Sequence, residues 1–207
     1  MGRGDAHRAL AEADPAMAAL IERFGRLRIS DRRAGSAKPD AFGTLVRIVV
    51  GQQVSSQAAR TIHGRLVEAF GGPPAPADVV GAVETLRGAG LSGRKASYVD
   101  GLGRMIVDGE LDLASLDALP DEEVIERLVE VRGLGRWSGE MFLISHLERP
   151  DVLSAGDLGI RRGVQTAMAL DELPAGKEVL EIGERWRPNR TLASLYLWRS
   201  VGDAPQE

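Results

Sequence analysis

The sequence predicts an all-α protein. Apolar residues recur at intervals of three and four along most of the 207-residue chain, which is the spacing of one helical face. Regular alternation of apolar and polar residues, the pattern of a half-buried strand, is not evident. The run Leu45–Val50 contains strand-forming residues, but its three-and-four spacing favours a helix. Glycine- and proline-rich breaks separate the periodic segments.

The periodic segments predict nine helices along the chain. In order, they cover residues 16–24, 42–50, 58–66, 79–87, 95–107, 121–129, 136–147, 158–170 and 191–201. The sequence GGPPAPAD, residues 71–78, is a clear break. Ser55 or Ser56, Ser92 and Asp121 are expected N-caps, because their side chains can accept bonds from the first helical amides.

Composition excludes several kinds of protein. Without cysteine, the chain has no disulfide, cysteine-held metal or iron–sulfur cluster, or thiol nucleophile. No apolar run reaches the roughly 18 residues of a membrane span, and the N-terminus lacks an apolar signal core. We therefore expect no membrane partner and a cytoplasmic location. The formal net charge of −4 counts weakly against a nucleic-acid partner, although a local basic strip suffices for such binding.

The first motif is Val131-Arg-Gly-Leu-Gly-Arg-Trp-Ser-Gly139, a Gly-x-Gly turn between two predicted helices. Gly133 and Gly135 can adopt conformations open only to glycine and allow another backbone to approach. Amide groups at the start of the second helix can hold a DNA phosphate, and Arg132 and Arg136 add positive charge. The alternative is an ordinary turn with a glycine C-cap.

The second motif is Asp151-Val-Leu-Ser-Ala-Gly-Asp157-Leu-Gly-Ile-Arg-Arg162, at the N-terminus of the next predicted helix. Asp157 is a favourable N-cap, and capping alone could explain it. The same exposed position also suits a catalytic carboxylate, and both roles can hold together.

Two further motifs lie earlier in the chain. In Gly51-Gln-Gln-Val-Ser-Ser-Gln-Ala-Ala59, an amide side chain could enter the gap that an extruded base leaves, or the segment could be a solvated turn. The choice between Gln52 and Gln53 stays open. Leu91-Ser-Gly-Arg-Lys-Ala-Ser-Tyr98 reads either as a capped helix with a solvated basic turn or as a phosphate contact.

Taken in this order, the four motifs resemble the helix-hairpin-helix DNA glycosylases, and among them the alkylation-repair branch, the 3-methyladenine DNA glycosylase II type. The resemblance extends from about Phe42 to Val201. It implies a two-lobed helical fold with a cleft between the lobes. Lobe A would comprise residues 1–41 and 140–207, and lobe B residues 42–139 with the hairpin at 128–139.

The resemblance also implies roles for individual residues. It places the catalytic carboxylate on Asp157 and the duplex wedge on Gln53. Five residues of the hairpin are expected to bind DNA: Arg132, Gly133, Gly135, Arg136 and Ser138. No cofactor is required, but such hairpins often bind Na⁺ or K⁺ through backbone carbonyls, here those of Val129, Val131 and Leu134. Related enzymes that also cut the backbone have a lysine where this chain has Trp137, so no lyase activity is expected.

The expected substrate is double-stranded DNA containing a damaged base, bound by a monomer of a bacterial, nucleoid-associated type. Trp137 and Met141 lie one helical turn apart, and Trp186 is a second aromatic residue that could contact the flipped base. For all three, core packing is the alternative. An alkylated purine is cationic and leaves readily, so a single carboxylate suffices. The competing hypotheses are a glycosylase for deaminated or ethenylated bases, a non-catalytic DNA-binding protein, and an all-α interaction module. The Gly-x-Gly hairpin departs from many hairpins of the family at two points. Those hairpins read Leu-Pro-Gly-x-Gly and end in Thr-Ala, whereas this one has Arg132 and Ser138-Gly139.

Overall fold

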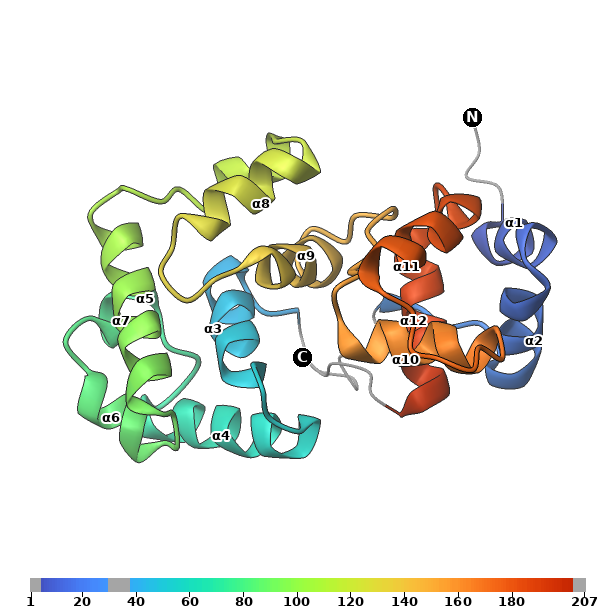
Figure 1. Cartoon of the computed structure of the whole chain (residues 1–207). Coiled ribbons are helices and arrows are strands. Elements are labelled where there is room, and N and C mark those ends of the chain that lie inside the picture. Colours follow the sequence, from blue (N-terminus) through green and yellow to red (C-terminus); the bar gives the residue numbers. More distant parts are fainter. Residues whose placement is uncertain (1–4, 30–37, 203–207) are drawn as a thin grey trace. The chain divides into compact units, whose positions relative to one another are not determined.

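The computed structural model in Figure 1 describes residues 5–29 and 38–202. Helices and loops make up this part of the chain, and it contains no strand. The all-α prediction is confirmed. None of the helices in these two ranges is long and apolar enough to cross a membrane.

The chain divides into two compact units. Of the described residues, unit 1 contains 5–29 and 148–202, and unit 2 contains 38–147. Among the described residues, both parts of unit 1 thus flank unit 2, which is continuous in sequence. The predicted boundary between the lobes lies at residue 140, whereas the structure keeps the helix Arg136–Ser145 whole within unit 2. The predicted lobes stay a prediction.

Unit 1 is built around its C-terminal helix. Its elements are α1 (Ala6–Ala13), α2 (Pro15–Phe24), α10 (Leu158–Ala167), α11 (Gly176–Gly183), the 3-10 turn η3 (Glu184–Trp186) and α12 (Arg190–Val201). α12 packs against α10 and α2 and buries Tyr196 and Trp198 completely. Gly163 on α10 allows this approach, because a Cβ there would stand 2.6 Å from the carbonyl oxygen of Leu197.

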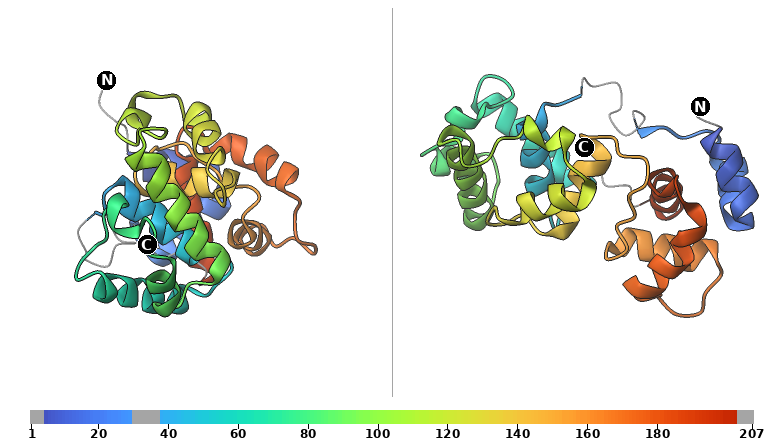
Figure 2. Two further views of the ribbon diagram at one scale, coloured as in Figure 1. Left: turned by 90° about the vertical axis from the view of Figure 1, so that its left-hand side faces the viewer. Right: turned by 90° about the horizontal axis from the view of Figure 1, so that it is seen from above.

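Unit 2 has α3 in contact with three of its other helices. Its elements are α3 (Ala41–Gly51), α4 (Ser56–Ala69), α5 (Pro76–Val79), α6 (Val83–Gly88), α7 (Gly93–Val107), the 3-10 turn η2 (Ser115–Ala118), α8 (Asp121–Val129) and α9 (Arg136–Ser145). α3 contacts α4, α7 and α9, while α5 and α6 pack on α7. Helices α5, α6 and α7 form the green portion of the ribbon in Figures 1 and 2.

Most of the predicted helices are present, with corrected ends. Ser55 and Ser92 are N-caps as predicted, whereas Pro120 takes the N-cap position expected for Asp121. The predicted helix at 79–87 is two short helices, α5 and α6, divided at Gly81. The helices predicted to reach Leu147 and Leu170 end at Ser145 and Ala167. Helices α1 and α11 were not predicted.

Candidate functional site

The Gly-x-Gly hairpin connects α8 to α9 within unit 2. Gly133 has a φ of +96°, and a Cβ at this position would stand 2.2 Å from Cδ2 of Tyr98 on α7. Glycine is therefore required here both by the backbone and by the aromatic ring beneath it. Gly135 differs, since a Cβ there would meet no heavy atom within 4 Å beyond its chain neighbours. This open position lies at the start of α9.

The first amides of α9 have no side-chain cap. Gly135 is the N-cap residue and has no side chain that could cap the N–H groups that follow it. Helix-terminal amides need a partner, and a phosphate oxygen is a good one. Ser138, predicted to bind DNA, has its side chain buried, with 2% of the residue exposed. Its contribution to a phosphate site is limited to its backbone.

The two arginines beside the turn have different surroundings. The Arg132 guanidinium is exposed and lies 5.9 Å from the ring centre of Tyr98. Arg136 makes a bidentate pair with Glu122, at 2.6 and 2.9 Å, and also bonds Glu140 at 3.2 Å. The bond from Arg136 lowers the pKa of the Glu122 carboxyl. A phosphate would have to compete with two carboxylates for Arg136, so Arg132 is the better placed of the pair.

The structure distinguishes the two glutamines of the Gln-Gln turn. Gln52 points to the hairpin, where its Nε2 donates to the carbonyl oxygen of Gly133 at 2.9 Å and to Oγ of Ser138 at 3.3 Å. Gln53 is exposed and has a φ of +56°, a left-handed conformation that is uncommon outside glycine. Backbone geometry of this kind recurs at functional sites and favours Gln53 as the wedge.

Lys95 holds the other side of the same turn. Its Nζ donates to the carbonyl oxygens of Val50 and Gln52, at 2.7 and 2.6 Å, where α3 ends. Burial lowers the pKa of this ammonium group. Neither the solvated basic turn nor the phosphate contact predicted for this motif includes these bonds of Lys95, whereas Arg94 is exposed.

The predicted base-contacting residues have unequal exposure. Trp137 is partly exposed near the start of α9, whereas Met141 is only 2% exposed. Trp186 is 1% exposed in the core of unit 1, and its Nε1 donates to Oδ2 of Asp14 at 2.8 Å. The packing alternative therefore describes Met141 and Trp186 in this structure. Trp137 is the remaining aromatic of the three.

Asp157 is the N-cap of α10 in unit 1. Its Oδ1 accepts from the backbone N–H of Ile160 and from Nε1 of Trp198, both at 2.9 Å. Trp198 is fully buried on α12, so the carboxylate is fixed by two elements. The cap role is confirmed, and sequence reasoning missed Trp198. Its position in α12, 41 residues away, gave no sequence pattern that could have identified it.

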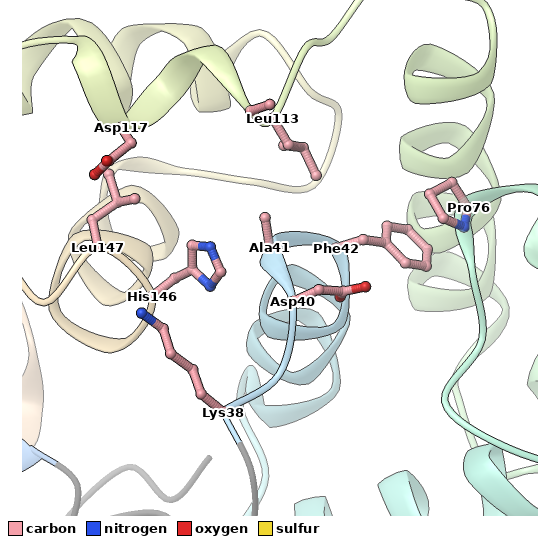
Figure 3. Close-up of a pocket in the computed structure, with 10 residues that line it drawn as sticks. Lys38, Asp40, Ala41, Phe42, Pro76, Leu113, Asp117, His146 and Leu147 are labelled. Atoms are coloured by element: carbon pink, nitrogen blue, oxygen red, sulfur yellow. The ribbon is translucent and has the colours of Figure 1, made fainter.

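Unit 2 also contains a pocket of about 510 Å³ away from any predicted site residue (Figure 3). His146 borders it, stacks on Phe142 and lies 3.3 Å, Nδ1 to Oγ1, from Thr44. Burial lowers the His146 pKa. The lining residues are Lys38, Asp40, Ala41, Phe42, Pro76, Leu113, Ala114, Asp117, His146 and Leu147.

Comparisons with known proteins identify related chains. Residues 46–188 match the model of the HhH-GPD superfamily of base excision DNA repair proteins. DNA-3-methyladenine glycosylase 1 of Schizosaccharomyces pombe is 35% identical, over 79% of this chain and 73% of the relative. A putative DNA-3-methyladenine glycosylase of Bacillus subtilis is 32% identical over 77% of this chain, which spans 58% of that relative's length.

Two solved structures share the fold. The 3-methyladenine DNA glycosylase of Schizosaccharomyces pombe, in complex with abasic DNA, has a TM-score of 0.87 at 32% identity, with 98% of each chain covered. A DNA-3-methyladenine glycosidase of Bacillus halodurans has a TM-score of 0.77 at 34% identity, covering 97% of this chain and 90% of the other.

Proposed function

The chain belongs to the HhH-GPD superfamily of base excision DNA repair proteins, and on this basis we propose that it is a glycosylase for alkylated bases. The reaction is hydrolysis of the bond between the damaged base and its sugar, with 3-methyladenine and 7-methylguanine as expected substrates. The observation that carries the proposal is Asp157, a carboxylate held at the mouth of α10 by Ile160 and Trp198. The names of the related proteins support the substrate class.

The duplex is held through its backbone. The uncapped amides of α9 and the exposed guanidinium of Arg132 would bind phosphate oxygens, which carry no sequence information. This suits an enzyme that must act wherever damage occurs. The proposed partner is double-stranded DNA bound by one copy of the chain, in the bacterial cytoplasm with the nucleoid.

The damaged base must leave the stack before it reacts. Flipping costs a few kcal/mol, and less when the base is poorly stacked or paired. Gln53 would fill the vacated space, because its side chain is exposed on a turn that Gln52 and Lys95 hold from behind. Trp137 would offer the flipped base an aromatic surface.

Asp157 would act on the sugar rather than on the base. As the glycosidic bond breaks, its electron pair departs with the base and positive charge develops on the sugar. A fixed carboxylate stabilises that charge and can orient the attacking water or take up its proton. The two hydrogen bonds to Oδ1 keep the carboxylate in one orientation, so little reorganisation is needed during the reaction. An alkylated purine is cationic and needs no added acid to leave.

A monovalent cation at the hairpin remains part of the proposal. α8 ends at Val129, and the carbonyls at a helix C-terminus carry partial negative charge. The Val131 carbonyl already accepts from the amide of Leu134 at 3.0 Å, and its second lone pair remains suitable for a cation. Val129, Val131 and Leu134 would hold the ion through backbone oxygens, which suit Na⁺ or K⁺. It would order the turn and take no part in the reaction.

The proposal is tested with a panel of duplex oligonucleotides that each contain one lesion. The panel includes 3-methyladenine or its stable analogue, 7-methylguanine, uracil, hypoxanthine and ethenoadenine. Chromatography of the released bases should show the methylated purines, with strand breaks appearing only after alkali treatment. Release of a deaminated or ethenylated base alone would contradict the proposed substrate class. Binding without release from any duplex would contradict the proposed enzyme and favour a non-catalytic DNA-binding protein.

A further inference from the structure

The turn that contains Gln52 and Gln53, which we call the wedge turn, is joined to the hairpin by one side chain. Gln52 comes from the end of α3, and its amide reaches both the Gly133 carbonyl and the Ser138 hydroxyl. These contacts cross from the segment that precedes Gln53 to the segment that would bind phosphate. Hydrogen bonds from this one side chain therefore link the proposed wedge directly to the proposed phosphate site.

Helix α7 supports both segments from below. Lys95 binds the carbonyls of Val50 and Gln52, and Tyr98 lies directly under Gly133. Lys95 and Tyr98 are three residues apart, so they share one face of the helix. One turn of α7 thus contacts the wedge turn and the hairpin together, and Gln52 closes the arrangement above it.

The bonding is well suited to a fixed geometry. A partly buried ammonium group that donates two short bonds to helix-terminal carbonyls neutralises the negative end of α3. The Gln53 backbone is left-handed, a conformation that persists only when the surrounding structure imposes it. The residues before it, Val50 and Gln52, are the ones that Lys95 binds.

We propose that Gln52 and Lys95 are positioning residues that hold the Gln53 turn in fixed register with the phosphate-binding hairpin. Neither residue needs to touch the damaged base. When the hairpin binds the DNA backbone, its fixed spacing from the turn places the Gln53 side chain opposite the gap in the duplex. The inference rests on the proposed function, because it concerns how that function inserts its wedge.

The test compares two affinities of each variant. One probe is an undamaged duplex, which needs only phosphate contacts. The other is the same duplex with a tetrahydrofuran abasic analogue, which allows the wedge to insert and involves no catalysis. Gln52→Met keeps the length of the side chain and removes its donors. We expect its affinity for the undamaged duplex to stay within about twofold, and its preference for the abasic analogue to fall about tenfold, as the loss of one or two hydrogen bonds would produce.

Three further variants define the interpretation. Gln52→Asn keeps the amide but is one methylene shorter, so it should behave like Gln52→Met. Lys95→Met should lower the same preference. Gln57→Met is the matched control, because Gln57 is an exposed glutamine at the start of α4 and should keep the preference of the unmodified protein.

The outcomes are distinguishable. A variant that is merely destabilised loses affinity for both duplexes alike, and that result for Gln52→Met and Gln52→Asn would overturn the positioning role. An unchanged preference in both would overturn it as well. If the unmodified protein itself shows no preference for the abasic analogue, the proposed function fails, and the inference fails with it.

Discussion

Asp157 shows how far a single residue can be interpreted from sequence. Its place before a helix predicted an N-cap, and the structure confirms it through the bond from Ile160. The second bond, from Trp198, depends on the packing of α12 against α10 and is invisible in the local sequence. For Trp186 the predicted contact with the base is not what the structure shows. Its indole N–H donates to Asp14 within the core of unit 1, which forms only when distant segments pack together.

Replacing the carboxylate with its amide should separate chemistry from folding. In Asp157→Asn the amide oxygen can still accept from Ile160 and Trp198, so the melting temperature should stay within a few degrees. Base release should fall by at least about a hundredfold, since a neutral group stabilises the developing charge poorly. DNA binding should be equal or tighter, because a negative charge near phosphates is gone. Single-turnover release assays decide this, and near-normal turnover by the folded variant would contradict the assignment.

Asp157→Ala provides the matched comparison. It removes the cap, at a cost of about 1 kcal/mol, and leaves the buried N–H of Trp198 without this acceptor, which costs a further 1–3 kcal/mol or so. The alanine variant should therefore unfold at lower urea than the asparagine variant, although both are inactive. Equal unfolding midpoints would show that the Oδ1 bonds contribute nothing to stability.

His63 on α4 should make stability depend on pH. Burial, with the nearby charge of Arg47, lowers its pKa from 6.5 to about 4 in the folded protein. Above pH 6.5 both the folded and unfolded states hold neutral histidine. As the pH falls from 6.5 towards 4, the unfolded state takes up a proton that the folded state does not, so stability is lost. Urea unfolding at pH 7.5 and 5 should show a larger loss in the unmodified protein than in His63→Gln. Equal losses would exclude His63 as the source.

At the scale of elements, local patterns predicted type better than extent. The Gly-x-Gly turn between two helices was predicted and is present. Gly81 divides the predicted helix at 79–87, because its φ of +75° interrupts the helix that the apolar spacing suggested. α11 was missed, since the apolar positions of Gly176–Gly183 are too few to show a period. Gln52 and Tyr98 contact the hairpin, and Lys95 binds carbonyls at the end of α3. These contacts link distant segments, and spacing alone carries no information about them.

The two glycines of the hairpin should respond differently to alanine. Gly133→Ala places a Cβ into the Tyr98 ring and forces a residue with a side chain into a positive φ. We expect a loss of about 2 kcal/mol or more, which corresponds to roughly 4–8 °C in Tm. Gly135→Ala meets no such obstacle and should keep its Tm. Its methyl group stands where a phosphate would approach, so its affinity for any duplex should fall.

Thermal melts and binding to two unrelated duplexes test this contrast together. Normal DNA binding by Gly135→Ala would contradict the proposal that the hairpin binds phosphate. A Gly133→Ala variant with an unchanged Tm would contradict the close contact with Tyr98.

The whole molecule has a net charge of −4, yet its proposed partner is a polyanion. Binding then depends on a few local contacts, which we take as about three or four. The logarithm of affinity should fall with the logarithm of salt concentration with a slope of about −3. Arg132→Gln should reduce the slope by about 1, and Arg136→Gln by less, because Glu122 and Glu140 already bind that guanidinium. Binding independent of salt would contradict backbone recognition.

Substrate preference also belongs to the whole molecule, because it depends on the aromatic surface and the carboxylate together. Trp137 is the partly exposed aromatic on α9, and a cation over an aromatic face gains about 0.5–2 kcal/mol. Neutral lesions gain less from that surface and also leave less readily without an acid to protonate them. We therefore expect N3- and N7-methylated purines to be released faster than uracil or hypoxanthine.

Trp137→Ala tests the aromatic part of this preference. It should slow the release of cationic bases most, by about threefold to thirtyfold, and so narrow the difference between the two classes of lesion. Met141→Leu is the matched control, since Met141 is buried on the same helix and its replacement keeps the volume. Single-turnover rates on otherwise identical duplexes give the comparison. If Trp137→Ala slows neutral and cationic lesions equally, the indole contributes contact area rather than charge recognition, and the preference for cations must come from their readiness to leave.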